Sequence, residues 1–250
     1  MTRTPTTTGT PATRALGLLG IAGTALLVVL GLFATAEDQV QGDAVRPIYV
    51  HVPSAWVAYL AFGTTALCSA LFLWKRTRSL TLDRFAGAAA EVGVLFTGLA
   101  LLTGMLWGRI TWGVFWTWDA RLTSTSLLFV LFLGYLALRR LPAAPEVRAK
   151  RAAVAGLVAF IDVPIVHMSV RWWNTLHQDP TILRSDPEIE GLMLFTVIFG
   201  VAVFSVLFAW MLLHRQRQLW LEDHQLATDV DEAIAERRAA AVAATSGAAR

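Results

Sequence analysis

The sequence predicts an all-α, polytopic membrane protein with six transmembrane helices and with both termini in the cytoplasm. Three observations support this prediction: an apolar composition, the gathering of apolar residues into long runs, and the uneven placement of basic residues between those runs. Of the 250 residues, 56% are hydrophobic and only 16% are charged, and the mean hydropathy is +0.56. Soluble domains have about 25% charged residues, so the composition disfavours a soluble protein.

Six apolar runs are long enough to cross a bilayer, whose hydrocarbon core needs about 20 consecutive apolar residues per helix. They span residues 15–35, 49–74, 85–106, 122–138, 152–170 and 192–213. The strands of a membrane β-barrel would instead alternate in polarity over about 10 residues. The runs do not alternate in this way, and helices are therefore expected. Pro53 is expected to mark where the second helix begins.

Basic residues divide unequally between the two sides that six spans define. Of the 21 lysines and arginines, 16 fall in the termini and in the connections 2–3 and 4–5, and five fall in the other three connections. Those five are Arg46, Arg109, Arg121, Arg171 and Arg184. The positive-inside rule then places both termini in the cytoplasm. The basic residues thus report orientation, and no nucleic-acid partner is expected.

The chain is expected to form one membrane domain, residues 14–213, with a tail at each end. Residues 1–13 are rich in threonine and proline and are predicted to be a disordered cytoplasmic N-terminus. Residues 214–250 are predicted to be a cytoplasmic tail, whose alanine-rich part from Asp229 is expected to form a short helix. The Ala-Thr-Ala motif at 34–36 resembles a signal-peptide cleavage site. An uncleaved first span is favoured, and cleavage stays the alternative.

Several enzyme and cytochrome signatures are absent from the sequence. The single cysteine, Cys68, cannot form an internal disulfide, and there is no C-x-x-C-H motif of a c-type cytochrome. There is also no Walker A, H-E-x-x-H or G-x-S-x-G motif. The chain is therefore not expected to be an enzyme, and any ATP-driven step is expected to come from a partner.

Aromatic residues concentrate in the connections on the side away from the termini. The predicted connection 3–4, residues 107–124, holds four of the ten tryptophans. The candidate ligand-binding residues there and at the start of connection 5–6 are Trp107, Trp112, Trp116, Trp118, Asp119, Arg121, Trp172 and Trp173. An aromatic belt at the membrane interface is the alternative explanation. Because seven tryptophans lie on this side and three on the other, a surface for a large, flat ligand with charged edges is favoured.

His51 and His177 flank this tryptophan-rich surface. Neutral imidazole binds haem iron, and two imidazoles give a six-coordinate site. The alternative is that each histidine hydrogen-bonds water or lipid headgroups. Two histidines beside tryptophans on one face favour iron ligation. Arg121 and Arg109 are candidates to pair with the haem propionates, and an ion pair with Asp119 is the alternative for Arg121.

Three further polar residues fall within or near the spans. His167 is expected to have a structural or supporting role, as a hydrogen-bond partner of Trp172 or Asn174, and a reserve ligand is the alternative. Glu91 and Asp162 are intramembrane carboxylates to which the sequence assigns no role. Glu91 is placed to pair with Arg84.

Three stretches of the sequence resemble a known family. They are Tyr49-Val-His51-Val-Pro53-Ser-Ala-Trp56, Trp118-Asp119-Ala120-Arg121-Leu122-Thr123-Ser124, and residues 164–178 with His167, Trp172, Trp173, Asn174 and His177. The tryptophan-rich loop is similar to the WWD signature of haem-handling membrane proteins, and its ending is similar to that of the CcmC (haem exporter protein C) family. The resemblance covers roughly residues 48–213. Ile110 and Phe115 depart from residues that some members carry there, which affects the detail of the loop only.

The resemblance implies a haem-handling protein of cytochrome c biogenesis in the bacterial cytoplasmic (inner) membrane, with its haem site on the periplasmic face. It implies that His51 and His177 bind the iron of haem b, non-covalently and transiently, and that the haem lies against Trp112, Trp116, Trp118 and Asp119. The implied partners are the haem chaperone CcmE, which receives the haem, together with CcmD and the transporter subunits CcmA and CcmB. A b-type cytochrome-like redox subunit is the first alternative. A haem-independent transporter with substrate groups near the bilayer midplane is the second.

Overall fold

The computed structural model describes residues 7–178 and 189–247, and every named element in them is helical. In chain order the elements are α1 (Pro11–Val29), a π-helical turn (Leu30–Ala34), a 3-10 turn (Asp43–Val45), α2 (Ile48–Leu73), α3 (Leu80–Trp112), α4 (Ala120–Arg139), α5 (Pro145–Phe160), α6 (Asp162–Trp172) and α7 (Gly191–Gly247). Six helical segments are long and apolar enough to cross a membrane, and α5 and α6 together form the fifth. The chain is therefore an all-α, multi-pass membrane protein, which confirms the predicted fold class. Of the predicted disordered N-terminus, residues 1–13, residues 1–6 lie outside the described residues. The prediction is wrong for residues 11–13, which form the first turn of α1 behind the N-cap Thr10.

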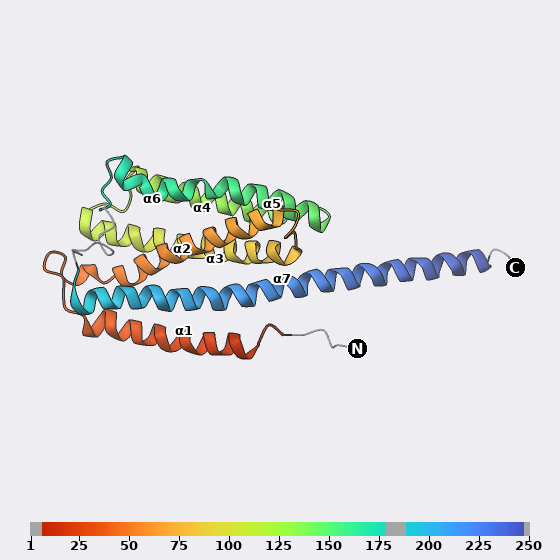
Figure 1. Ribbon diagram of the computed structural model, residues 1–250, viewed down its shortest axis with the longest axis horizontal. Coiled ribbons are helices and arrows are strands. Elements are labelled where there is room, and N and C mark those ends of the chain that lie inside the picture. Colours follow the sequence, from red (N-terminus) through yellow and green to blue (C-terminus); the bar gives the residue numbers. More distant parts are fainter. Residues whose placement is uncertain (1–6, 179–188, 248–250) are drawn as a thin grey trace.

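The helices run side by side in one elongated bundle, with α7 between α1 and the other helices (Figure 1). We call the end of the bundle that carries His51, near the start of α2, the histidine end. The N-terminus of α1 and the C-terminus of α7 both lie toward the opposite end. The two termini thus share one side, as an even number of spans requires. The assignment of that side to the cytoplasm stays a prediction from the basic residues.

Small residues bring α1 close to α7. An added Cβ at Gly20 would lie 2.6 Å from Leu207, and one at Gly23 would lie 2.8 Å from Val203. Lipid tails are as apolar as the helices, so the hydrophobic effect does not drive membrane helices together. Close approach of the backbones increases van der Waals contact, which stabilises the packing instead. Replacing either glycine would therefore push α1 away from α7.

A second stripe of small residues lies on the face of α3 that packs against α2. Its members are Ala86, Gly93, Ala100 and Gly104. An added Cβ at Gly93 would lie 2.5 Å from the ring of Phe62 on α2. The backbone of α3 is close enough for its Ala86 carbonyl to accept a hydrogen bond from the Thr65 hydroxyl of α2, at 3.2 Å. The stripe therefore gives side chains of α2 access to main-chain carbonyls of α3.

The fifth span is two helices and not the single helix that the apolar run suggests. α5 ends at Phe160 and α6 begins at Asp162. Pro164 causes the break because it has no N–H to donate and its ring meets the carbonyl four residues earlier, on Phe160. At the junction the Ile161 N–H donates to the carbonyl of Val158, only three residues earlier, at 3.2 Å, as in the tighter turn of a 3-10 helix.

The second helix begins five residues before Pro53, so the expectation that Pro53 marks its start is wrong. The helix begins at Ile48, directly after Pro47, whose φ of −53° and ψ of −21° are already helical. Pro53 is buried inside the helix, and an added Cβ at Gly200 of α7 would lie 3.0 Å from its ring. The proline therefore serves as a packing surface between α2 and α7.

α7 runs as one helix of 57 residues and extends far beyond the bundle (Figure 1). The alanine-rich stretch that was expected as a separate short helix is thus the continuation of the sixth span. Residues 201–246 contain no glycine or proline, so no residue in them interrupts the helix. Asp223 pairs with Arg84 of α3 and with Arg148 of α5, at 3.2 Å in each case, which anchors the base of the extension.

Charged side chains pair between helices away from the histidine end. Glu91 of α3 accepts from Arg215 of α7 through both carboxylate oxygens. Because Arg84 pairs with the α7 extension instead, the expected pair between Glu91 and Arg84 is wrong. The most buried pair joins Asp83 of α3, which is 3% exposed, to Arg139 of α4, with one of its two contacts at 2.9 Å.

Replacing Asp83 by asparagine is expected to destabilise the protein by about 3–5 kcal/mol, because it leaves the buried Arg139 guanidinium without its counter-charge. The measurement is thermal unfolding of the purified protein in detergent. Glu236→Gln, on the exposed part of α7, is the control and should leave the midpoint unchanged. Equal midpoints for Asp83→Asn and the parent would contradict a stabilising role for the pair.

Candidate functional site

The structure brings His51 and His177 together, although 126 positions separate them in the sequence. His51 lies in the first turn of α2, and His177 lies in the segment that follows α6. Their ring centroids are 6.4 Å apart, with an angle of 37° between the ring planes. Both side chains are partly exposed, so a ligand can reach them.

Each of the two rings is held through its Nδ1 atom. The Nδ1 of His51 lies 3.0 Å from the Ala100 carbonyl oxygen and 3.2 Å from the Thr103 hydroxyl. The Nδ1 of His177 lies 2.8 Å from the carbonyl oxygen of Gln178. A carbonyl can only accept, so Nδ1 carries the proton in both rings. Nε2 of each neutral ring is then left with the lone pair that binds a metal ion, and a backbone carbonyl on the other nitrogen is the usual support of such a ligand.

The spacing of the two rings matches that of two ligands on one metal ion. An imidazole nitrogen binds a metal at about 2.0 Å and lies about 1.1 Å from its ring centre, so two opposed rings have centres about 6 Å apart. The described residues contain no group of three or more histidine, cysteine or acidic side chains that could complete a protein-only metal site. Two imidazoles alone suit an iron whose other four ligands come from a porphyrin.

Gly104 provides the space that the His51 ring occupies. An added Cβ at this position would lie 2.9 Å from Cε1 and 3.3 Å from Nδ1 of His51. Gly104 lies one turn after Ala100, whose carbonyl holds the same ring. The small-residue stripe of α3 therefore both accommodates the imidazole and orients it.

Two of the six tryptophans that were predicted to bind a ligand contact the histidines. The ring of Trp107, in α3, lies 5.9 Å from that of His51 and meets it edge to face. The ring of Trp112, the last residue of α3, lies 6.4 Å from that of His177. The indole N–H of Trp107 donates to the Gln41 side chain at 2.9 Å, so the connection between α1 and α2 also contributes to this site.

The other four predicted tryptophans form two separate pairs near the same end. Trp116 and Trp118 lie 5.4 Å apart, and Trp172 and Trp173 lie 5.8 Å apart. Within the described part of the chain, no ring contact joins these four to either histidine. Trp118 is 82% exposed, which makes it available to a large ligand or to a partner protein.

A family model described as haem exporter protein C matches residues 4–231. The chain belongs to the haem exporter protein C family. The "Heme exporter protein C" of Bradyrhizobium diazoefficiens is 40% identical over 192 residues, which cover 75% of this chain and 72% of that protein. A "Putative cytochrome c biosynthesis ccmC-like mitochondrial protein" of Marchantia polymorpha is 38% identical over 79% of this chain and 83% of its own length. The "Heme exporter protein C" of Escherichia coli (strain K12) is 35% identical over 82% of each chain.

Asp119 links the tryptophan-rich loop to the segment that carries His177. One carboxylate oxygen accepts from the Leu122 N–H at 2.8 Å and caps α4. The other accepts from the Leu176 N–H at 3.2 Å, one residue before His177. A single aspartate therefore fixes the start of α4 and positions the second histidine.

Arg121 is not paired with Asp119 in the structure. Its guanidinium donates to the Tyr59 hydroxyl of α2 at 3.2 Å. Its Nε, like the indole nitrogen of Trp116, is buried without a hydrogen-bond partner among the described residues. Each of these two N–H groups can donate to a carboxylate that a ligand supplies. The Nε atoms of Arg84, Arg148 and Arg151, near the opposite end, are unpartnered in the same way. Arg109, in the last turn of α3, instead donates to the carbonyl of Gly113, which caps the end of that helix.

Burial is the main cause that lowers the pKa of His177, and the positive charge of Arg121 lowers this pKa further. The carbonyl of Gln178 and the charge of Asp119 oppose these effects without cancelling them. A lowered pKa keeps the imidazole neutral down to more acidic pH than in water, and only the neutral ring binds a metal.

The structure places His167 against Tyr59 and not against Asn174 or a tryptophan. The two rings lie 6.0 Å apart and meet edge to face. Sequence reasoning missed Tyr59, Gln41 and Gly104 as parts of this end of the bundle. All three contact residues that are distant in the sequence, so no local sequence pattern indicated these contacts. For Gly104, the repeat of small residues along α3 was the signal that could have found it.

Gly104→Ala is expected to reduce haem binding strongly while leaving the protein folded, because the new methyl group displaces the His51 ring. Alanine is favoured over glycine in a helix by about 1 kcal/mol, so α3 itself should not be destabilised by its propensity. The measurement is titration of purified protein with haem, followed by the Soret absorbance. Gly134→Ala in α4, where an added Cβ meets nothing within 4 Å, is the matched control. Haem binding that is equal in the two variants would contradict the role of Gly104.

Proposed function

We propose that this chain holds haem b non-covalently between His51 and His177 and passes it to the haem chaperone CcmE, in a complex with CcmD and the transporter subunits CcmA and CcmB. The bacterial inner membrane is the proposed location, with the histidine end on the periplasmic face. The observation that carries the proposal is the pair of imidazoles with ring centroids 6.4 Å apart, each with an Nε2 that bonds no other described residue. The names of the relatives, which refer to haem export and cytochrome c biosynthesis, support the same assignment.

The two histidines are held differently, which suits a ligand that must be both bound and released. His51 lies within a membrane helix, and its Nδ1 bonds two oxygen atoms of the neighbouring helix α3. His177 lies outside the helices, on a segment that Asp119 holds through one hydrogen bond to Leu176. We infer that the iron stays on His51 while the bond to His177 opens first, so that the chaperone can offer its own ligand from that side.

Charged and aromatic groups complete the proposed site. The free Nε of Arg121 and the indole N–H of Trp116 are placed to donate to a haem propionate. Trp107 and Trp112 lie beside the two imidazoles and would line the edge of the porphyrin. The exposed Trp118 is then the first candidate for contact with the chaperone.

Membranes that contain this protein are expected to show a low-spin haem spectrum, because two nitrogen ligands give a six-coordinate iron. His51→Ala and His177→Ala should each abolish or strongly weaken that spectrum. His214→Ala is the control, since His214 bonds Thr8 at the opposite end of the bundle. An unchanged low-spin spectrum in the double variant of His51 and His177 would disprove the ligand assignment.

Loading of the chaperone separates haem transfer from a b-type cytochrome function. Trp118→Ala is expected to keep the low-spin spectrum and to lower the yield of haem-loaded CcmE in a pull-down, because the exposed indole no longer contacts the partner. Trp74→Ala is the control, since Trp74 is also well exposed, at 57%, but lies at the opposite end of α2. Full chaperone loading by the Trp118 variant would count against a docking role for this indole.

A further inference from the structure

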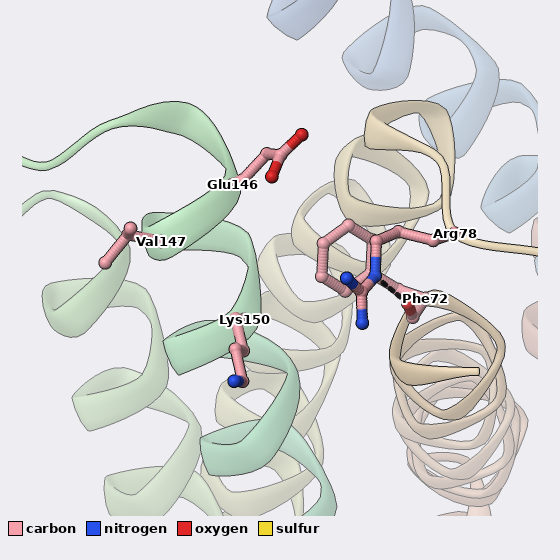
Figure 2. A pocket seen from close by; sticks show the side chains of 5 residues that line it. All are labelled: Phe72, Arg78, Glu146, Val147 and Lys150. Carbon is pink, nitrogen blue, oxygen red and sulfur yellow. Dashed lines mark hydrogen bonds between the residues drawn. The ribbon is translucent and has the colours of Figure 1, made fainter. Parts of the chain in front are cut away.

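A small pocket lies at the end of the bundle opposite the histidines. It has a volume of about 220 Å³ and is lined by Phe72 at the end of α2, Arg78 in the following turn, and Glu146, Val147 and Lys150 of α5 (Figure 2). On α2, Phe72 is 21 residues from His51, which corresponds to about 32 Å along a helix. The proposed haem function therefore makes no use of this pocket.

Charged groups of both signs face the pocket without being paired. Arg78 donates through Nε to the Phe72 carbonyl at 3.4 Å, and its guanidinium lies 5.9 Å from the ring of Phe72. The two terminal NH₂ groups of Arg78 have no hydrogen-bond partner among residues 7–178 and 189–247 and are available to a ligand. In the part of the chain that the structure describes, neither Lys150 nor Glu146 has a hydrogen bond or an ion pair. Figure 2 shows the three charged ends around one gap between α5 and the end of α2.

The size of the pocket restricts what it can hold. Sites for drug-sized molecules and cofactors have volumes of about 300–1,000 Å³, so this pocket is too small for a porphyrin or a nucleotide. A single phosphate with a short substituent fits it. Guanidinium and ammonium groups are the side chains that bind phosphate, and basic pockets between membrane helices on the cytoplasmic side bind lipid headgroups.

The surface of α5 that continues from the pocket toward the end of this helix suits the acyl chains of a lipid. Exposed apolar residues continue along the same face of α5, at Val147, Val154 and Val158, which are 52%, 49% and 59% exposed. Their spacing of seven and four residues keeps them on one side of the helix. A lipid whose phosphate lies between Arg78 and Lys150 can therefore rest its chains on this stripe.

We propose that this pocket binds the headgroup of a zwitterionic phospholipid that carries a primary ammonium group, phosphatidylethanolamine. Arg78 and Lys150 bind the phosphate, and Glu146 accepts from the ammonium group. An anionic headgroup such as that of phosphatidylglycerol is disfavoured because its neutral glycerol leaves the Glu146 carboxylate without a positive partner. A choline headgroup is disfavoured because it has no N–H to donate. The proposal is independent of the haem site.

Native mass spectrometry of the full-length protein, with phosphatidylethanolamine, phosphatidylglycerol or phosphatidylcholine added in detergent, tests the proposal. The parent should retain phosphatidylethanolamine in preference to the other two lipids. Arg78→Ala with Lys150→Ala should lower this retention about tenfold, as expected for the loss of charge-assisted contacts. Lys75→Ala with Arg140→Ala, two exposed cations that do not line the pocket, is the matched control and should retain the lipid.

Glu146→Gln tests the headgroup preference itself and should shift it from phosphatidylethanolamine to phosphatidylglycerol. An unchanged preference would show that Glu146 pairs with Lys150 along the helix instead, and it would overturn the assignment. A parent that prefers phosphatidylglycerol would overturn it in favour of a general anionic-lipid site. Equal lipid retention by the pocket variant and the parent would disprove the site. Displacement of the lipid by millimolar inorganic phosphate would show a site for free phosphate instead.

Discussion

The close packing of α2 against α3 is the constraint on which the candidate site depends. The small-residue stripe of α3 lets the backbones approach until side chains of α2 reach main-chain carbonyls of α3. The same geometry occurs twice: Thr65 donates to the Ala86 carbonyl, and His51 bonds the Ala100 carbonyl three to four turns farther along. In a membrane, where water cannot satisfy these groups, such bonds position a side chain firmly. The orientation of His51 is therefore a property of the helix pair and not of a loop.

The two ends of the bundle carry different kinds of interaction. Away from the histidines, ion pairs such as Asp83 with Arg139 join neighbouring helices and are made wholly within the chain. At the histidine end, donors such as Arg121 Nε and metal-binding atoms such as the two Nε2 have no partner within the described residues. Unpartnered donors occur at both ends, since Nε of Arg84 and Arg148 also lacks a partner among the described residues. The histidine end differs in carrying two imidazole nitrogens that can bind a metal ion.

Sequence reasoning reached the six spans because long apolar runs are a direct consequence of the thickness of the bilayer. It also chose the two histidines that the fold brings together, because both lie beside tryptophans on one predicted side. It failed where the outcome depends on partners distant in sequence. The haem contact predicted for Asp119 stays a prediction, and the structure adds a bond from its carboxylate to the backbone of Leu176, 57 residues away, which the sequence did not indicate. Gln41 has its role through packing that no local pattern describes, whereas the repeat of small residues along α3 could have indicated Gly104.

The uninterrupted α7 has a mechanical consequence. At 1.5 Å per residue its 57 residues reach about 85 Å, while the hydrocarbon core of a bilayer is about 30 Å thick. Beyond the anchored Asp223, positions 224–236 carry four acidic residues and no lysine or arginine, and Arg237 and Arg238 follow them. Anionic lipid headgroups attract basic segments and not acidic ones, so this acidic stretch has no electrostatic reason to lie along the bilayer. A protein that grips its tip sits tens of ångströms from the lipid and can tilt the last span from that height.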